Sequence, residues 1–219
     1  MRPGRPPKVA GPKKAAKPRP LPDPLTRDQA AAIIAVPNIR CDRGLRYRAI
    51  LETLYRAGMR ISEVLALQPE DVRFTEQMLR VRNSKRGTHR NIPMGPILQT
   101  YLEAWDACRP ESEWFFAASS GKKMMQKTVW NAIKGYVVKA AAEHPELGFD
   151  RRGPVSAHTF RHTFATELVE EGVDIRYVQN LLGHASIANT MIYVKVRPQM
   201  LRDIMQRRDL DRSAGGGGA

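Results

Sequence analysis

The chain contains few cysteines and no long apolar run, and each shortage excludes a class of protein. Its two cysteines, Cys41 and Cys108, do not have the spacing of metal-binding pairs. We therefore expect no disulfide framework, which suits a reducing compartment such as the cytoplasm. The longest apolar run, AAAIIAV at residues 30–36, is far too short to cross a bilayer. No apolar segment follows the basic start of the sequence, so we expect no secretory signal.

Acidic residues are also in short supply. The 219 residues include 36 lysines and arginines against 22 aspartates and glutamates, which gives a formal net charge of +14. This excess says little about the fold but favours a polyanionic partner, and nucleic acid before a membrane. A solubilising charge coat is the simpler alternative, less favoured at so high a charge. The chain is long enough for one domain with its own core.

Residues 1–24 differ in composition from the rest. They hold eight of the sixteen prolines and seven basic residues, with Asp23 as their single acidic residue. Such a segment cannot bury enough apolar surface to fold, so we expect an extended, disordered arm. Its RPGRPPK stretch resembles the core of an AT-hook, which would place Arg5 and Lys8 on DNA. A basic linker that contacts phosphates without sequence preference is an equally good interpretation.

Residues 25–208 predict one mostly helical α+β domain with a small antiparallel sheet. Thr26 and Gln29 have the spacing of a capping box and predict a helix to about Ala35. Ser62 is predicted to cap a short helix that runs through EVLAL. Periodicity predicts further helices over 43–57, 96–107 and 127–142 and from about residues 157, 174, 186 and 198, and strands at DVRF, MLRVR and RNIPM. The glycine-rich residues 209–219 are expected to form a flexible tail.

Three basic residues occur together at the start of the helix expected near residue 157. His158, Arg161 and His162 are spaced i, i+3 and i+4, so they share one helical face. The two histidines have the spacing of a zinc pair. However, Thr159 stands where the metalloprotease motif has glutamate, and the arginine would repel a cation. We expect no metal here, and an ordinary surface helix with one satisfied histidine is about equally consistent with this segment alone.

Four further features each have an ordinary structural interpretation. Arg60 and Glu63 could form an exposed ion pair of little energetic value, Lys85 a solvated turn, and His184 a turn after glycine, while Tyr193 could be a core aromatic. Taken together with the basic helix, they form a set suited to phosphoryl transfer on DNA. A phosphodiester under attack gathers negative charge on its non-bridging oxygens, and arginine can bind these with two parallel hydrogen bonds. Such electrostatic stabilisation needs no metal.

The order of these residues resembles the catalytic domain of the tyrosine recombinases, the phage-integrase family of site-specific recombinases. In that family an arginine is followed by a hairpin lysine, His-x-x-Arg, Gly-His and a tyrosine. Every member occurs here in order, between about residues 25 and 205. The segments that carry the resemblance are LYRAGMRISEVLAL, RVRNSKRGTHRNIPMG and AHTFRHTFATELVEEGVDIRYVQNLLGHASIANTMIYVKV. The resemblance implies the fold of the DNA breaking-rejoining enzymes.

The resemblance also implies roles in strand cleavage. Tyr193 would attack the scissile phosphate and form a 3′-phosphotyrosyl link, releasing a 5′-hydroxyl. Arg60 and Arg161 would hold the non-bridging oxygens, and Lys85 would protonate the leaving oxygen. The link conserves the energy of the phosphodiester, so neither ATP nor any other cofactor is expected.

The remaining residues would support this reaction. His158 would assist removal of the tyrosine proton, and His184 would hydrogen-bond the phosphate. The cost of burying His158 beside the motif arginine would be offset by the bound anion. Glu63 would orient or balance the basic cluster, and His162 is expected to pack beside it. Arg86 stands where a glycine commonly follows the hairpin lysine and would add positive charge beside the DNA.

The resemblance implies double-stranded DNA as partner and a homotetramer on synapsed DNA, with an accessory bending or directionality factor as a further option. No membrane partner is expected, and the expected location is the cytoplasm, at the nucleoid. Because the family usually has a helical DNA-binding domain before the catalytic one, this chain is expected to act as a catalytic-domain-only member, with a partner protein, or with the arm as its grip. Two other functions stay open: a type IB topoisomerase activity, and a DNA-binding regulator that does not cut.

Overall fold

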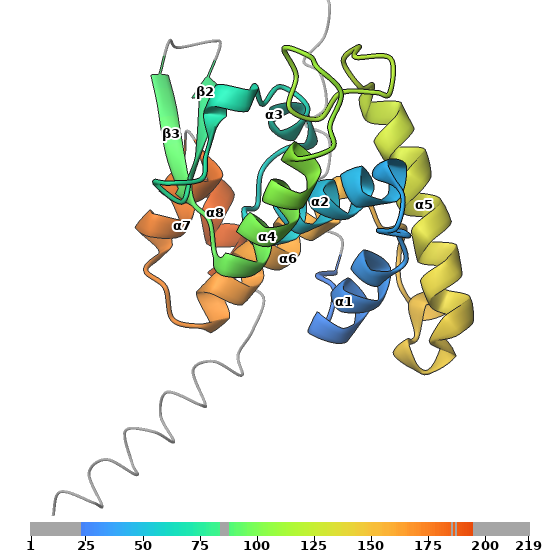
Figure 1. Ribbon diagram of the computed structural model, residues 1–219. Coiled ribbons are helices and arrows are strands. Elements are labelled where there is room, and N and C mark those ends of the chain that lie inside the picture. The colour runs from blue at the N-terminus through green and yellow to red at the C-terminus, as the bar shows by residue number, and fades with distance from the viewer. Residues whose placement is uncertain (1–22, 84–87, 185, 187, 195–219) are drawn as a thin grey trace, which may run out of the picture.

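Helices make up most of the described chain, as Figure 1 shows. The computed structural model describes residues 23–83, 88–184, 186 and 188–194. The helices are α1 (Arg27–Ala35), α2 (Asp42–Arg56), α3 (Ile61–Val64), α4 (Pro96–Asp106), α5 (Gln126–Glu143), α6 (Ala157–Glu170), α7 (Ile175–Leu182) and α8 (Ala188–Val194). Short 3-10 turns are η1 (Pro69–Asp71), η2 (Pro145–Leu147) and η3 (Phe149–Arg151), and the strands are β1 (Val72–Arg73), β2 (Met78–Asn83) and β3 (Thr88–Pro93). The predicted α+β class is confirmed.

Helix α1 begins where the capping box predicts. The Thr26 hydroxyl accepts the N–H of Gln29 at 3.1 Å, and the Gln29 side chain accepts the N–H of Thr26 at 3.1 Å. This exchange satisfies two N–H groups that a helix start leaves without partners. Leu25 is buried, and its N–H donates to the Thr163 hydroxyl at 2.8 Å, which ties this segment to α6.

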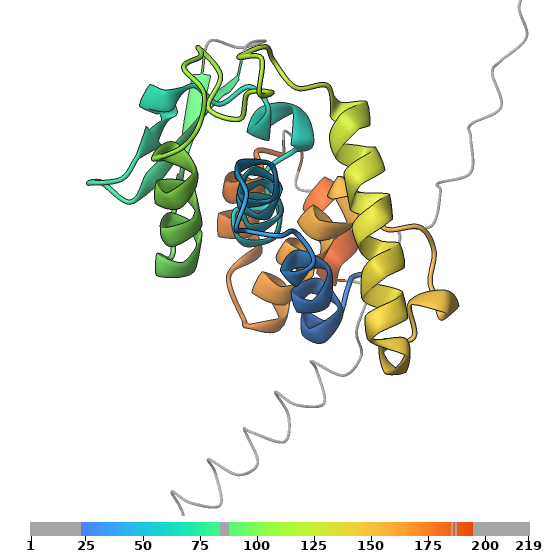
Figure 2. The same ribbon diagram turned by 45° about the vertical axis from the view of Figure 1, so that its right-hand side comes forward.

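Helix α2 lies at the centre of the domain, with α1, α4 and α6 packed against it. Ile50, Leu51 and Leu54 point into the main core, as their spacing predicts. Figures 1 and 2 show α5 on the opposite side of the domain from the β2–β3 hairpin. After α2 the chain passes through Gly58 at φ +58°, where a Cβ would lie 2.2 Å from the Phe164 ring of α6. The close approach of α6 therefore requires glycine at this position.

The start of α3 corrects one prediction. Ser62 does not cap this helix: it lies inside it and is exposed, and Arg60 is the N-cap with an extended backbone. The Glu63 carboxylate accepts the N–H of Arg60 at 2.8 Å and also binds its guanidinium. A glutamate at the third helical position can satisfy the N–H of the cap, so the helix starts earlier than a serine cap would allow.

The three strands form an antiparallel sheet in the order β1–β2–β3. Arg90 pairs with Val81, and Ile92 pairs with Leu79. Val81, Leu79 and Ile92 are all buried, and paired residues share a face, so Arg90 lies on the inward face of the hairpin. Residues 84–87, which include the predicted Lys85 and Arg86, lie outside the described residues.

A second, smaller core joins α6, α7 and α8. Its buried members are Ala165, Val169, Val178, Leu182 and Tyr193. Helices near residues 157, 174 and 186 are thus confirmed, whereas the helix expected near 198, most of the arm and the tail lie outside the described residues. No helix in the described part of the chain is long and apolar enough to span a membrane.

Candidate active site

Three arginines from distant segments meet at the C-terminal end of α7. Arg90 Nε donates to the carbonyl oxygen of Leu181 at 2.8 Å, and Arg161 Nη2 donates to that of Leu182 at 2.6 Å. Arg60 Nη2 reaches the next carbonyl, that of Gly183, at 3.4 Å. The last carbonyls of a helix lack partners within it and carry its partial negative charge, so this end attracts cations.

Glu63 is the carboxylate at the centre of these arginines. Its Oε1 accepts from Arg60 Nη1 at 2.8 Å and from Arg90 Nη1 at 3.1 Å. Its Oε2 accepts from the backbone N–H of Arg60 and from Arg90 Nη2, both at 2.8 Å. Burial by itself would raise the pKa of Glu63, but the hydrogen bonds and charge of Arg90, with the bonds from Arg60, hold that pKa below its ordinary value. Glu63 is therefore ionised at neutral pH.

Arg161 is almost completely buried, with 1% of its surface exposed. Besides the bond to Leu182, its Nη1 donates to the carbonyl oxygen of Gly58 at 2.6 Å and lies 4.0 Å from Glu63 Oε2. Burial, followed by the charge of Arg60, lowers the pKa of Arg161 to about 10. The guanidinium is still charged at neutral pH, and backbone carbonyls already offset the cost of burying it before any anion binds.

Two histidines face this positive cluster in their neutral form. His184 Nδ1 lies 2.9 Å from the Thr190 hydroxyl, and burial together with the charges of Arg161, Arg60 and other neighbours lowers its pKa to about 4. His158 is exposed, yet partial desolvation and the charges of Arg161 and Arg60 also lower its pKa. Both rings are therefore free to act as neutral hydrogen-bonding or proton-accepting groups at pH 7.

Tyr193 lies in the second core beside these histidines, with 6% of its surface exposed. Its ring stacks on His184, with centroids 6.4 Å apart, and packs obliquely on His162, with centroids 5.0 Å apart. Burial raises the pKa of Tyr193, while the charges of Arg161 and Arg60 act in the opposite direction. The phenol is thus within the electrostatic reach of both arginines, but it is protonated in this DNA-free structure.

The structure brings together every predicted site residue that it describes. These are Arg60, Glu63, His158, Arg161, His162, His184 and Tyr193. The predicted Lys85, Arg86, Arg5 and Lys8 lie outside the described residues. In the part of the chain that the structure describes, no group of three or more His, Cys, Asp or Glu side chains is placed to hold a metal ion.

Sequence reasoning missed two members of the site, Arg90 and Thr190. Arg90 occupies an inward position of the strand that also carries Ile92, and a charge at such a position is a usable signal. Thr190 comes three residues before Tyr193 and so shares its helical face, where it is fully buried. The partners of Arg90 are far away in the sequence, at Glu63 and Leu181. Thr190 is only six residues from His184, and their contact depends on how α8 packs beside the end of α7.

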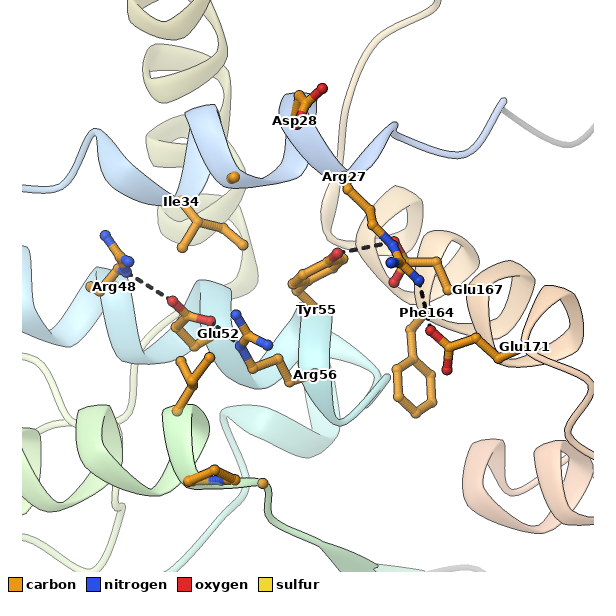
Figure 3. A pocket seen from close by; sticks show the side chains of 14 residues that line it. Arg27, Asp28, Ile34, Arg48, Glu52, Tyr55, Arg56, Phe164, Glu167 and Glu171 are labelled. Carbon is orange, nitrogen blue, oxygen red and sulfur yellow. Dashed lines mark hydrogen bonds and ion pairs between the residues drawn. The ribbon is translucent and has the colours of Figure 1, made fainter.

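A separate cavity contains none of these residues. Figure 3 shows its lining from α1, α2 and α6, including Arg27, Glu52, Tyr55 and Glu167. The Tyr55 hydroxyl donates to Glu167 Oε1 at 3.0 Å, and Arg27 also pairs with this carboxylate. The charges that line this cavity are already matched, which distinguishes it from the positive cluster at α7.

Comparison with known proteins places the chain among recombinases in sequence. The model of the phage integrase family matches residues 24–200. The tyrosine recombinase XerD of Ralstonia nicotianae is 36% identical over 197 residues, which cover 87% of this chain and 61% of that protein. The tyrosine recombinase XerA of Pyrococcus horikoshii is 35% identical over 204 residues, which cover 91% and 66%. The chain thus spans less than two thirds of the length of either relative.

Solved structures of a recombinase and an integrase have a fold similar to that of this chain. A crystal structure of XerA recombinase superposes with a TM-score of 0.70 at 28% identity, over 91% of this chain and 66% of that one. The Tn1549 transposon integrase, solved in complex with transposon right end DNA, superposes with a TM-score of 0.72 at 21% identity, over 89% and 68%. The latter likeness concerns the fold alone.

Proposed function

The chain belongs to the phage integrase family, and we propose that it is a site-specific DNA recombinase that cuts and rejoins double-stranded DNA through a covalent tyrosine link. One observation carries the proposal. Arg60, Arg161, His184 and Tyr193 come from four separate segments and converge at one end of α7. A protein that only binds DNA needs no tyrosine beside two arginines that already have backbone and carboxylate partners.

In the proposed reaction the Tyr193 oxygen attacks the scissile phosphorus. The new phosphotyrosyl bond replaces the bond to the 5′-oxygen, and the negative charge of the intermediate is shared with Arg60 and Arg161. The phenol proton passes to neutral His158, and Lys85, between β2 and β3, protonates the leaving 5′-oxygen. His184 hydrogen-bonds the phosphate, while its contact with Thr190 fixes the ring. Attack by another 5′-hydroxyl on the phosphotyrosine reverses the steps and rejoins the strand.

Binding of DNA has to change the burial and the pKa of Tyr193. Burial raises the pKa of the phenol in the free protein, and both Tyr193 and Arg161 are covered. The scissile phosphate therefore requires these groups to become accessible before the reaction can begin. His162 packs against the Tyr193 ring. Its Nδ1 is buried and has no hydrogen-bond partner among the residues that the structure describes, and burial together with the charge of His158 lowers the pKa of His162. Both observations favour a packing role.

Helix α5 supplies a second surface suited to DNA. Its exposed lysines are Lys127, Lys134 and Lys139, and its only acidic residue is Glu143 at the end. Lys134 Nζ lies 3.5 Å from the centroid of the exposed Trp130 ring, which pairs a cation with an aromatic surface. Lys127, Trp130 and Lys134 are spaced i, i+3 and i+7 and so share one face of the helix, which attracts phosphates without reading sequence. We assign Arg86 and the arm residues Arg5 and Lys8 the same supporting role.

The proposed partner is duplex DNA, and the proposed working form is a homotetramer on two synapsed sites, with an accessory factor where direction is controlled. Within this proposal, residues 1–24 form the mobile basic arm, residues 25–208 the catalytic domain and residues 209–219 a flexible tail. The proposed location is the cytoplasm, at the nucleoid. Similarity to proteins named tyrosine recombinases, at 36% and 35% identity, supports the choice of partner.

The test is trapping of the covalent intermediate. The full chain is incubated with fragmented DNA from its source, denatured with detergent, and the DNA ends attached to protein are sequenced. A nicked duplex of the recovered site then serves as a suicide substrate. Tyr193→Phe should bind this duplex but form no adduct, whereas Tyr177→Phe, at a 69% exposed tyrosine on α7, should react normally.

Other results would redirect the proposal. Adduct formation by Tyr193→Phe at the normal yield would overturn the assignment of the nucleophile. A wild-type protein that relaxes supercoiled DNA without forming Holliday junctions would be a topoisomerase. Site-specific binding by a wild-type protein that yields no adduct would indicate a regulator that does not cut.

A further inference from the structure

Arg90 is a charged residue in an apolar position. It shares the inward face of the hairpin with Val81 and Ile92, and its side chain is 13% exposed. Arg80 and Arg82 of the same hairpin lie on the other face, where both donate to Asp71 at 2.8 Å. The inward position of Arg90 thus has a different function from the ordinary surface arginines beside it.

All three nitrogen atoms of the Arg90 guanidinium have partners within the protein. Nε donates to Leu181, and both Nη atoms donate to the two oxygens of Glu63. In this geometry Arg90 cannot also bind a phosphate with a fork of two parallel N–H groups. Each Nη keeps one N–H, but the two point along different edges and form no fork. The main effect of Arg90 on the reaction is therefore expected to pass through the groups that it holds.

Glu63 is the first of these groups. Its carboxylate accepts four hydrogen bonds, of which Arg90 supplies two and Arg60 supplies two. Without Arg90, the nearest further cation is Arg161, whose Nη1 lies 4.0 Å away. A half-satisfied, partly buried carboxylate would then draw Arg60 and Arg161 toward itself and compete with a phosphate for both.

The second group is the segment that bears His184. Arg90 holds the Leu181 carbonyl, two residues before Gly183. Gly183 adopts φ +63°, and a Cβ there would lie 2.8 Å from Arg90 Nη1. The guanidinium therefore occupies the space that a side chain would need, and it fixes the end of α7 against β3. The same strand begins directly after residues 84–87, which include Lys85.

We infer that Arg90 is a positioning residue for strand cleavage. It satisfies Glu63, so that this carboxylate does not compete with the phosphate for Arg60 and Arg161, and it fixes the His184 segment to the hairpin. The inference rests on the proposed recombinase function.

The experiment measures single-turnover cleavage of the nicked duplex, together with DNA affinity and thermal unfolding. Arg90→Met should slow cleavage roughly 10- to 100-fold while changing DNA affinity less than about threefold, because most contacts with DNA lie elsewhere. Arg90→Lys, which keeps the charge but not the fork, should fall between Arg90→Met and wild type. Arg80→Met is the matched control on the other face and should cleave at close to the wild-type rate.

Combination with Glu63→Gln separates positioning from a structural role. If the unsatisfied carboxylate is what slows Arg90→Met, removal of its charge should make Arg90→Met/Glu63→Gln cleave faster than Arg90→Met alone. A structural role predicts the reverse, since the second substitution would add to the damage. An equal or slower double variant, or an Arg90→Met rate matching that of Arg80→Met, would overturn the inference alone. The absence of any adduct from wild type would overturn the proposed function, and the inference with it.

Discussion

Two glutamates in this protein are each held between arginines, and they differ in where the arginines come from. Glu52 binds Arg48 at 3.0 Å and Arg56 at 2.6 Å, one turn before and one turn after it on α2. Glu63 binds Arg60 from its own turn and Arg90 from β3, with Arg161 of α6 at 4.0 Å. The first set is local to one helix, whereas the second exists only after the chain has folded.

The two sets also differ in what surrounds the cations. The guanidinium groups of Arg48 and Arg56 lie over the rings of Tyr101 and Tyr55, at 4.5 and 5.6 Å from the centroids. The arginines around Glu63 instead share three successive carbonyl oxygens at the end of α7. Glu52 is paired with two arginines and Glu63 is surrounded by three, so the set around Glu63 has the larger net positive charge. That excess contributes to the lowered pKa values of His158 and His184. The charges around Glu52 stabilise the fold, whereas those around Glu63 create a positive electrostatic potential that favours an anion.

The largest effect should come from Arg161→Lys. Lysine keeps the charge but cannot bond the Gly58 and Leu182 carbonyls while also presenting a fork to phosphate. We expect cleavage to fall on the order of 1,000-fold and the free energy of unfolding to fall by about 1–3 kcal/mol. Single-turnover cleavage and urea denaturation check the two parts. Cleavage within tenfold of wild type would contradict the assigned role.

Exchange of each glutamate for glutamine tests the comparison directly. Glu63→Gln should lower the cleavage rate roughly 3- to 10-fold, less than Arg90→Met, because Arg60 loses the carboxylate that orients it but no unsatisfied charge is left behind. Glu52→Gln should leave cleavage unchanged and lower the free energy of unfolding by about 1–2 kcal/mol, because a buried carboxylate with two partners is replaced by a neutral amide. The cleavage rate and the free energy of unfolding are measured for both Glu63→Gln and Glu52→Gln. The contrast fails if Glu52→Gln slows cleavage as much as Glu63→Gln.

The positive excess also predicts a pH dependence of stability. The pKa of His184 is about 4 in the folded protein, below its ordinary value of 6.5. The unfolded chain therefore takes up the proton more readily, so stability is complete above about pH 6.5 and is lost as the pH falls toward 4. His184→Gln should reduce this loss in melting temperature. His144→Gln, at an exposed histidine paired with Glu146, should not reduce it. If the melting temperature of His184→Gln falls with pH as much as that of wild type, this would count against a neutral His184.

The smallest effect is expected at the cavity of Figure 3. The Tyr55 hydroxyl donates to Glu167, and burial together with the nearby carboxylate raises the pKa of Tyr55 to about 12. Tyr55→Phe should lower the free energy of unfolding by about 0.5–1.5 kcal/mol, because Glu167 keeps a nearby cation in Arg27. Cleavage should not change. A clear loss of cleavage would link this cavity to the active site.

The local elements of the fold could be predicted from the sequence, because each depends on neighbouring residues. The Thr26–Gln29 capping box, the inward side chains of α2 and the glycine after α7 all follow from spacing or backbone freedom. The wrong prediction that Ser62 caps α3 also concerns only a few neighbouring residues. Two caps were available within one turn, and the tertiary partners of Glu63 favour the start at Arg60.

The candidate site divides in a similar way. His158 and Arg161 are neighbours on one helical turn, and their joint placement needed only the helix period. Arg90 could not be assigned, because its partner Glu63 belongs to another element. Thr190 is close to His184 in the sequence, but their contact depends on the packing of α8 beside the end of α7. The burial of Arg161 against carbonyl oxygens was also beyond local reasoning, since it depends on how α2, α6 and α7 meet.

The sequence by itself determined the helices, the short sheet, the excess of positive charge and the order of the reactive side chains. Each of these is set by composition or by spacing within a few residues. Only the tertiary structure decided that Arg60, Arg90 and Arg161 would share one carboxylate and the end of one helix, and that Tyr193 would lie buried beside two neutral histidines. The physical reason is that charge compensation and desolvation depend on distances between segments, and packing of the whole chain sets those distances.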